Sequence, residues 1–508
     1  MLARVWSASL MGIEAVKVGV EVDVSGGLPG IVIVGLPDAA VQESKERVKA
    51  ALRNSGLAFP MRRIVINLTP ADLRKEGPSF DLPISIGILA ASDQINLQLL
   101  GDFLFLGEVS LDGGLRPVTG VLPIAAAAKR MGFMGLVVCQ TNASEAAVLE
   151  GLSVYGFEHL SQVSQFLNDP TSVKPIEAEG ASLNPEPQRY LDLKDVKGQA
   201  HARRALEIAA AGGHNLIFVG PPGSGKTMLA RRLPGILPPL EFSEALEVTK
   251  IHSVAGLLKD QGRLLRQRPF RSPHHSASGP ALVGGGSFPK PGEISLAHRG
   301  VLFLDELTEF KRDVLEFLRQ PLEDGFVSIS RARQSVTFPA QFMLVASTNP
   351  CPCGYYADPI QACTCSPRQR EAYWAKLSGP LMDRIDLQVA VNRLKPEEIT
   401  QQGQGEASTP IRSRVQAARD LANARFQAEG NLHCNAQMNS QQLRRWCQLD
   451  DATRQLLETA ITRLGLSARA TDRILKVART IADLANSPKV EAPHVAEAIQ
   501  YRTIDRLQ

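Results

Sequence analysis

The chain carries the run Leu216-Ile217-Phe218-Val219-Gly220-Pro221-Pro222-Gly223-Ser224-Gly225-Lys226-Thr227, followed by a helical pattern. Its four apolar residues indicate a buried strand, and the next eight match the phosphate-binding pattern G-x-x-x-x-G-K-T placed between a strand and a helix. The glycines let backbone N–H groups close around phosphates, and the helix N-terminus adds positive charge. We expect Lys226 to reach the β- and γ-phosphates of ATP and the Thr227 hydroxyl to ligate Mg²⁺. The alternative is a glycine-rich turn that matches by chance.

Two acids follow a second apolar run downstream. Val301-Leu-Phe-Leu304 indicates a strand, and Asp305 and Glu306 come directly after it. Ligands of open α/β sheets bind at the carboxyl ends of the strands, so these acids are placed to act on the same nucleotide. We expect Asp305 to hold Mg²⁺ and Glu306 to polarise the attacking water. The sequence therefore predicts a P-loop α/β ATPase domain.

Size and composition limit the remaining possibilities. The 508 residues exceed what a single core usually holds, and 44% hydrophobic with 21% charged residues is a globular balance. No apolar run is long enough for a membrane span, and the N-terminus is a poor secretory signal, so we expect a cytoplasmic protein without membrane contact. The net charge of +4 does not itself indicate a nucleic-acid partner, so such contacts must come from local patches.

The chain divides into blocks. Residues 1–168 alternate strand-like and helical runs and predict an α+β domain, and the Pro- and Glu-rich residues 169–189 predict a linker. Residues 190–400 hold the ATPase motifs. A loop, Gln401–Pro410, leads into residues 411–508, whose pattern predicts a C-terminal helical lid.

Several longer motifs resemble a known family. The ATPase block contains Arg268–His275, Gly292–Gly300 and Arg319–Gly325, which resemble Mg-chelatase-like AAA+ ATPases. The N-terminal block contains Ile33–Asp38, Asn67–Asp72 and Lys75–Pro83, which resemble the ComM/YifB family specifically. That resemblance implies a homohexameric, ATP-driven DNA helicase that promotes branch migration in natural transformation and homologous recombination.

The resemblance also assigns roles to three further residues. Asn349, after the apolar run Phe342–Ala346, fits the sensor-1 position, which orients the lytic water. Arg384 resembles the arginine finger that reaches the γ-phosphate held by a neighbouring subunit; the alternative is a surface ion pair with Asp383 or Asp386. Arg469 resembles sensor 2, with Arg473 as the alternative one turn later.

The N-terminal block resembles the Lon protease domain, which has a ribosomal-S5-type fold. Its serine motif survives as Gly77-Pro78-Ser79, but Leu122 stands where the resemblance expects the catalytic lysine. A Ser/Lys dyad needs the lysine as a base, and an apolar residue cannot replace it. We therefore expect a non-peptidase module used for assembly or DNA engagement.

Four cysteines lie within fifteen positions, at Cys351, Cys353, Cys363 and Cys365. Four thiolates suit a tetrahedral Zn²⁺ site, although C-x-C pairs are tighter than the usual spacing. The alternative is four free cysteines beside Asn349. Cys139, Cys434 and Cys447 are scattered and are expected to be packed thiols. The adjacent His274 and His275 are interpreted as part of a structural loop.

Candidate DNA contacts lie in two places. Phe326–Phe338 reads as a β-hairpin with Arg331 and Arg333 near its tip, where they would grip phosphates of single-stranded or branched DNA. The alternative is a solvated tip. The basic stretch Lys259–Arg271 is the second candidate. An ATPase of the Mg-chelatase or MoxR-like protein-remodelling kind, using the same core, is the alternative function, and an ATP-dependent protease is opposed by Leu122.

Overall fold

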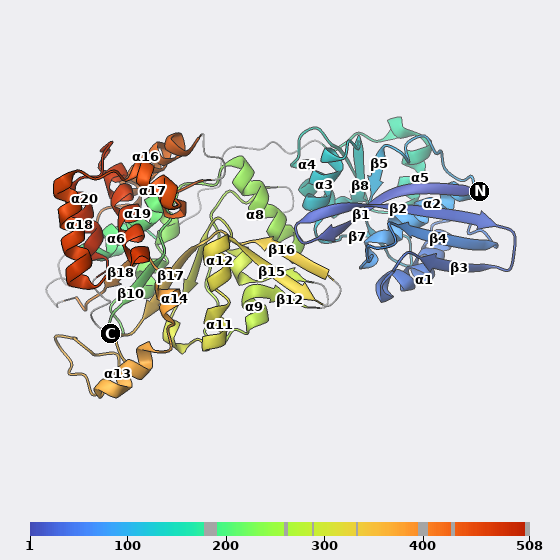
Figure 1. The fold of residues 1–508 in the computed structure, drawn as a ribbon. Coiled ribbons are helices and arrows are strands. Elements are labelled where there is room, and N and C mark those ends of the chain that lie inside the picture. Colours follow the sequence, from blue (N-terminus) through green and yellow to red (C-terminus); the bar gives the residue numbers. More distant parts are fainter. Residues whose placement is uncertain are drawn as a thin grey trace. The chain divides into compact units, whose positions relative to one another are not determined.

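A computed structural model describes residues 1–176, 190–258, 263–286, 289–331, 334–394, 405–427 and 432–502 (Figure 1). Two compact units are present. The N-terminal unit is drawn from Met1–Glu186, Phe242–Leu265 and Pro289–Pro291, and the P-loop unit from Pro187–Glu241, Arg266–Phe288 and Gly292–Gln508. Within the described residues, no helix combines the length and apolar character that crossing a membrane requires.

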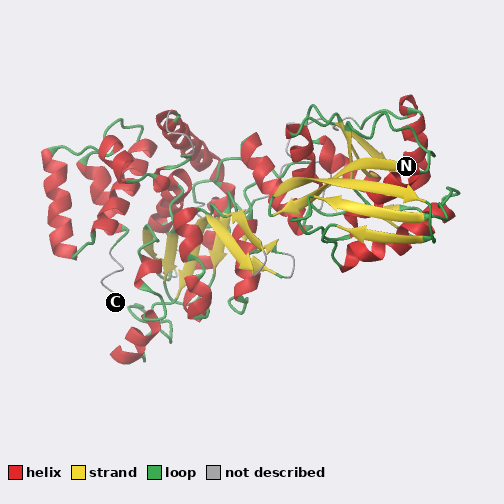
Figure 2. Cartoon of the chain, turned by 45° about the vertical axis from the view of Figure 1, so that its right-hand side comes forward, coloured by secondary structure: helices red, strands yellow, loops and turns green. Residues whose placement is uncertain are grey.

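A seven-stranded mixed sheet forms the N-terminal unit, in the order β3-β4-β2-β1-β5-β8-β9 (Figure 2). Its strands are β1 (Leu2–Met11), β2 (Glu14–Ser25), β3 (Gly30–Val34), β4 (Arg63–Thr69), β5 (Phe103–Phe105), β8 (Gly135–Cys139) and β9 (Ser153–Phe157), beside a short hairpin of β6 (Glu108–Val109) and β7 (Leu115–Arg116). Its helices are α1 (Ala39–Asn54), α2 (Asp81–Ala91), α3 (Val121–Arg130), α4 (Gln140–Ala147), α5 (Leu160–Asn168) and α8 (Phe242–Ala255). The α+β prediction is confirmed.

Side-chain alternation divides the core of this unit into two layers. On β5, Phe103 and Phe105 join the cluster that includes α2, whereas Leu104 joins the cluster that includes α3. Successive residues of a strand point to opposite faces, so helices cover both faces of the sheet at β5. All of α2 is buried, which explains why its sequence is apolar on every side.

Helix α8 belongs to this unit although its sequence lies between segments of the P-loop unit. It packs against α3. The Ser253 hydroxyl donates a 2.5 Å hydrogen bond to Glu145 Oε1, which also accepts from the Leu122 backbone N–H at 3.0 Å. Burial raises the pKa of the Glu145 carboxyl, against the opposing effect of these hydrogen bonds.

The P-loop unit is built on a five-stranded sheet in the order β11-β14-β17-β10-β18. Every neighbouring pair is parallel, and β10 pairs with β17 from Leu216↔Val345 to Val219↔Thr348. The strands are β10 (Leu216–Val219), β11 (Phe270–Arg271), β14 (Val301–Leu304), β17 (Met343–Thr348) and β18 (Leu387–Ala390). Strands β10, β14 and β17 are buried throughout, as expected for a parallel sheet covered on both faces.

Helices and one hairpin complete this unit. The helices that precede the lid are α6 (Ala200–Gly212), α7 (Lys226–Ala230), α9 (Gly279–Val283), α10 (Glu293–Leu296), α11 (Arg312–Glu316), α12 (Arg319–Asp324), α13 (Pro367–Trp374) and α14 (Gly379–Met382). The lid helices, red to orange in Figure 1, are α16 (Ser408–Phe426), α17 (Ser440–Trp446), α18 (Asp451–Leu464), α19 (Ala468–Leu484) and α20 (Ala492–Gln500). Helices α16 and α19 pack on α6, which joins the lid to the sheet core.

Candidate nucleotide-binding site

The loop from Gly220 to Gly225 connects β10 to α7, as the sequence predicts. Gly223 and Gly225 have φ angles of +77° and +94°, in the left-handed region that favours glycine. Gly220 is required for another reason, because a Cβ there would lie 2.0 Å from the Val391 carbonyl oxygen. An added Cβ at Gly223 or Gly225 would meet nothing within 4 Å, so the loop borders open space that suits a phosphate chain.

Lys226 begins α7 and is buried. Its Nζ donates to the carbonyl oxygens of Gly220 at 2.7 Å and Pro221 at 2.9 Å, and to Asn349 Oδ1 at 3.2 Å. Burial lowers the pKa of the Lys226 ammonium to about 8, against the opposing effect of the Asp305 and Glu306 carboxylates. The structure thus brings Lys226 and Asn349 together.

Asp305 lies at the carboxyl end of β14, next to the end of β17. The Thr227 hydroxyl donates a 2.8 Å hydrogen bond to Asp305 Oδ2, and the Ser347 hydroxyl donates to Asp305 Oδ1. A hydroxyl and a carboxylate are oxygen ligands of the kind that Mg²⁺ prefers. The residues present therefore fit the Mg²⁺ ion that the sequence implies.

Glu306 has a φ of +54°, and its backbone N–H donates to Ser347 Oγ at 3.3 Å. Its side chain is 57% exposed, and its Oε2 lies 3.8 Å from His275 Nδ1. The sequence interpretation of His275 as part of a structural loop missed this contact. Strand β11 pairs with β14 in parallel, with Arg271 opposite Leu302. His275 follows Arg271 by four residues, and Glu306 follows Leu302 by four, so the two residues lie at the same edge of the sheet.

The candidate arginines each contact an acid of their own chain. Arg384 donates to the Pro380 carbonyl oxygen at 2.6 Å and forms an ion pair with Glu323. Arg384 thus has an ion pair within its own chain, as the alternative to the finger expects, but its acid partner is Glu323 and not Asp383 or Asp386. Arg469, in α19, is 71% exposed and lies 4.0 Å from Asp383.

Asp386 is buried and belongs to a network of hydrogen bonds and ion pairs between the sheet and the lid. Its carboxylate bonds to His214 Nδ1 at 3.0 Å and pairs with Arg473 of α19. Burial would raise the pKa of Asp386, but Arg473 and His214 outweigh it and hold this pKa well below its usual range. The alternative sensor-2 residue Arg473 thus has a structural partner.

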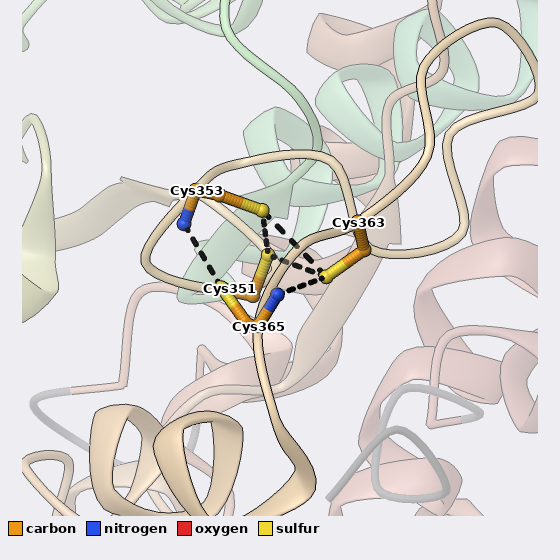
Figure 3. Close-up of side chains that lie close together, drawn as sticks. All are labelled: Cys351, Cys353, Cys363 and Cys365. Carbon is orange, nitrogen blue, oxygen red and sulfur yellow. Dashed lines mark hydrogen bonds between the residues drawn. The ribbon is translucent and has the colours of Figure 1, made fainter.

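The four clustered cysteines come together next to the end of β17 (Figure 3). Their sulfur atoms lie within 4.8 Å of one another, with Cys351 Sγ 3.3 Å from Cys353 Sγ and 3.7 Å from Cys363 Sγ. Two backbone N–H groups donate to sulfur, Cys353 N to Cys365 Sγ at 3.3 Å and Cys365 N to Cys363 Sγ at 3.4 Å. The remaining cysteines, Cys139, Cys434 and Cys447, are buried singly, as predicted.

The predicted β-hairpin is present. Strands β15 (Phe326–Arg331) and β16 (Gln334–Pro339) pair antiparallel, from Phe326↔Pro339 to Arg331↔Gln334. The backbone of Arg331 therefore ends β15, whereas Arg333 lies outside the described residues.

The second basic candidate is partly occupied by structural contacts. Lys259 lies outside the described residues. Arg268 donates to the Arg299 carbonyl oxygen at 2.8 Å, and Arg271 forms two 2.6 Å hydrogen bonds with the Glu293 carboxylate. These two arginines hold loops and strands of the P-loop unit together.

In the N-terminal unit, Ser79 lies in a single 3₁₀ turn, Pro78–Phe80. Leu122 is fully buried in the apolar cluster that contains α3. The position at which the resemblance to Lon predicts a lysine is thus part of the hydrophobic core.

The P-loop follows β10, the acid pair follows β14, and β17 lies between these two strands. Together with the helical lid, this arrangement defines the AAA+ class of P-loop proteins. Three family matches agree: "Magnesium chelatase, subunit ChlI" over residues 192–399, "Subunit ChlI of Mg-chelatase" over 20–142, and "Magnesium chelatase, subunit ChlI C-terminal" over 405–502. The chain is 48% identical to competence protein ComM of Haemophilus influenzae and 44% identical to YifB of Salmonella typhimurium, covering all of this chain and 98% of each relative. The chain belongs to the ComM/YifB family of Mg-chelatase-like AAA+ ATPases.

A shorter similarity concerns a protease. Over 141 residues, 27% of this chain is 29% identical to Lon protease 2 of Bacillus subtilis, of which it covers 25%. The match agrees with the expected resemblance to Lon.

Proposed function

We propose that this protein is an ATP-driven hexameric DNA motor, a helicase that promotes branch migration in natural transformation and homologous recombination. The convergence of Lys226, Thr227, Asp305 and Asn349 at the carboxyl ends of adjacent parallel strands carries the proposal. Such an arrangement suits phosphoryl transfer, in which positioning and charge stabilisation supply most of the catalysis.

Each residue at this edge has a proposed task in hydrolysis. Lys226 exchanges its bonds to the Gly220 and Pro221 carbonyls for bonds to the β- and γ-phosphates of ATP. Thr227 and Asp305 hold Mg²⁺, which when bound neutralises charge on the phosphate oxygens. Glu306 polarises the attacking water, and Asn349 orients it.

A ring follows from the proposed role of Arg384. The guanidinium acts on the γ-phosphate bound by the neighbouring subunit, so each ATP site is complete only between two chains. In the isolated chain Arg384 is held by Glu323, a residue 61% exposed, and subunit contact replaces this pair. Arg469 of the lid is the proposed sensor 2, and its high exposure leaves it free to approach a phosphate.

DNA as the substrate is supported by the hairpin and by the relatives. Arg331 ends β15, and Arg333 follows it by two residues in the sequence. Two arginines so close together would grip phosphates without reading sequence. A full-length relative at 48% identity is named a competence protein, which supports a role in DNA uptake and recombination here.

The N-terminal unit is proposed to serve assembly or DNA engagement and not proteolysis. Leu122 is fully buried and has no group that accepts a proton from Ser79.

The test is the ATPase rate of purified protein with forked, single-stranded or double-stranded DNA, and with an unfolded protein as the competing substrate. Stimulation by DNA is expected. Lys226→Ala should lose turnover, and Glu306→Gln should retain ATP without hydrolysing it. Stimulation by protein alone would contradict the DNA motor and favour a remodelling ATPase of the Mg-chelatase or MoxR-like kind.

A further inference from the structure

The four-cysteine cluster already has the dimensions of a metal site. In a tetrahedral site, Zn–S bonds of about 2.3 Å place the sulfur atoms about 3.8 Å apart. The three sulfurs of Cys351, Cys353 and Cys363 are separated by 3.3, 3.6 and 3.7 Å, and all four lie within 4.8 Å. In Figure 3 the side chains come from two separate stretches of one loop and point toward one another. These separations exceed an S–S bond of about 2.05 Å, so the cysteines are free thiols.

The cluster adjoins the nucleotide site through a short turn. Cys351 follows Asn349 by two residues, and the backbone N–H of Gly354 donates to the Cys351 carbonyl oxygen at 2.9 Å. Gly354 has a φ of +86°, and a Cβ there would lie 2.7 Å from Pro222 Cδ and 3.9 Å from Asn349 Cγ. The main chain at Gly354 therefore packs directly on the phosphate-binding loop.

The other side of the turn is anchored to α13. The Trp374 indole N–H donates to the Pro350 carbonyl oxygen at 3.1 Å, and the hydroxyls of Thr308 and Tyr373 are 2.5 Å apart. Pro350 is thus fixed on one side, and the contacts among the cysteines hold Cys351 and Cys353 on the other. Among the described residues, no other group of three or more histidine, cysteine or acidic side chains has the spacing for a metal.

We propose that Cys351, Cys353, Cys363 and Cys365 bind one Zn²⁺, and that this ion holds the 351–354 turn against Pro222 and Asn349. The metal is then a structural requirement of the ATP site. Each ligating thiol forms one Zn–S bond and releases its proton to solvent. This role rests on the proposed binding of ATP at Lys226, whereas the presence of zinc does not.

The first measurement is the metal content of the purified full-length chain, by elemental analysis. About one zinc per chain is expected, falling to a small fraction in Cys353→Ser and Cys365→Ser. The control, Cys139→Ser, alters a buried thiol of the N-terminal unit and should keep its zinc. Folded wild-type protein without zinc that binds ATP normally would overturn the proposal.

The second measurement is the affinity for a fluorescent ATP analogue, before and after zinc removal by a chelator, with circular dichroism to follow folding. Affinity should fall roughly tenfold without zinc and recover when zinc is restored. Gly354→Ala leaves all four ligands in place, so it should keep its zinc yet bind the analogue roughly tenfold more weakly. Unchanged affinity for the analogue in Gly354→Ala or after chelation would contradict the proposed support of the ATP site by this turn. Failure of DNA to stimulate ATPase, with both zinc results as expected, would instead contradict only the DNA motor.

Discussion

The Thr227 hydroxyl lies 2.8 Å from Asp305 Oδ2, although 78 residues separate them in the sequence. Thr227 is in the first turn of α7, and Asp305 follows β14. Strand β17 lies between β10 and β14, so the P-loop and the acid meet across the Ser347 and Asn349 end of that strand. The sheet order itself therefore assembles the site.

ATP affinity should depend on pH through Lys226. Burial lowers the pKa of this lysine to about 8 in the nucleotide-free chain, and phosphate contacts raise it. Below pH 8 the ammonium is already charged, so the affinity for ATP does not change with pH. Above that pH, binding must take up a proton, and affinity should fall about tenfold per pH unit. Calorimetry in buffers of different ionisation enthalpy measures the uptake, and no proton uptake at pH 9 would contradict this role of Lys226.

Arg384→Ala should keep the fold and ATP binding but lose hydrolysis by about a thousandfold, because arginine fingers stabilise the charge of phosphoryl transfer. Mixing this variant with Lys226→Ala protein should restore some activity, since intact half-sites meet at certain junctions. Arg319→Ala is the matched control, as Arg319 lies near Glu323 but pairs with Glu316. Proven mixing without any recovery would place Arg384 in cis.

Asp386→Asn should destabilise the P-loop unit by about 3 kcal/mol, since it leaves the guanidinium of Arg473 without its buried partner. Asp383→Asn is the control: its 4.0 Å contact with Arg469 is exposed and should contribute well under about 1 kcal/mol. The depressed pKa of Asp386 stabilises the fold above about pH 4, and this contribution is lost as the pH falls further. Denaturant unfolding measures the free energy of unfolding of both variants. Equal values for Asp386→Asn and Asp383→Asn would contradict a stabilising role for this network.

Replacing both Arg331 and Arg333 by alanine should leave basal ATPase unchanged but remove its stimulation by DNA. For every phosphate that an arginine no longer neutralises, the salt dependence of single-strand binding should decrease by a slope of about 0.7, without a change in sequence preference. A double variant of two exposed lid arginines, Arg454→Ala/Arg463→Ala, serves as the control. If the hairpin variant still unwinds DNA like the wild type, DNA is gripped elsewhere, and the stretch Lys259–Arg271 is the next candidate.

Local patterns were sufficient for the elements that carry the P-loop. The predicted strands Leu216–Val219 and Val301–Leu304 match β10 and β14 because four apolar residues between turn or polar residues leave little choice of bounds. Helix α1 begins at Ala39 because the Asp38 side chain caps it, accepting a hydrogen bond from the Val41 N–H at 2.7 Å.

Contacts between distant segments were beyond such patterns. Strand β11 has only two residues, too few for a periodic signal, so the sequence did not place His275 beside Glu306. Neither Glu323 as the partner of Arg384 nor the packing of α8 on α3 has a local signature. Each of these contacts joins elements that become neighbours only in the completed fold.

The most direct test of the central claim is branch migration on a labelled three-stranded or forked DNA, measured with ATP and wild-type protein. Strand exchange that requires ATP and Mg²⁺, and that Glu306→Gln abolishes while still binding the DNA, is the predicted result. Wild-type protein that hydrolyses ATP and binds the same DNA, yet moves no branch under any condition in which hydrolysis proceeds, would contradict a DNA motor.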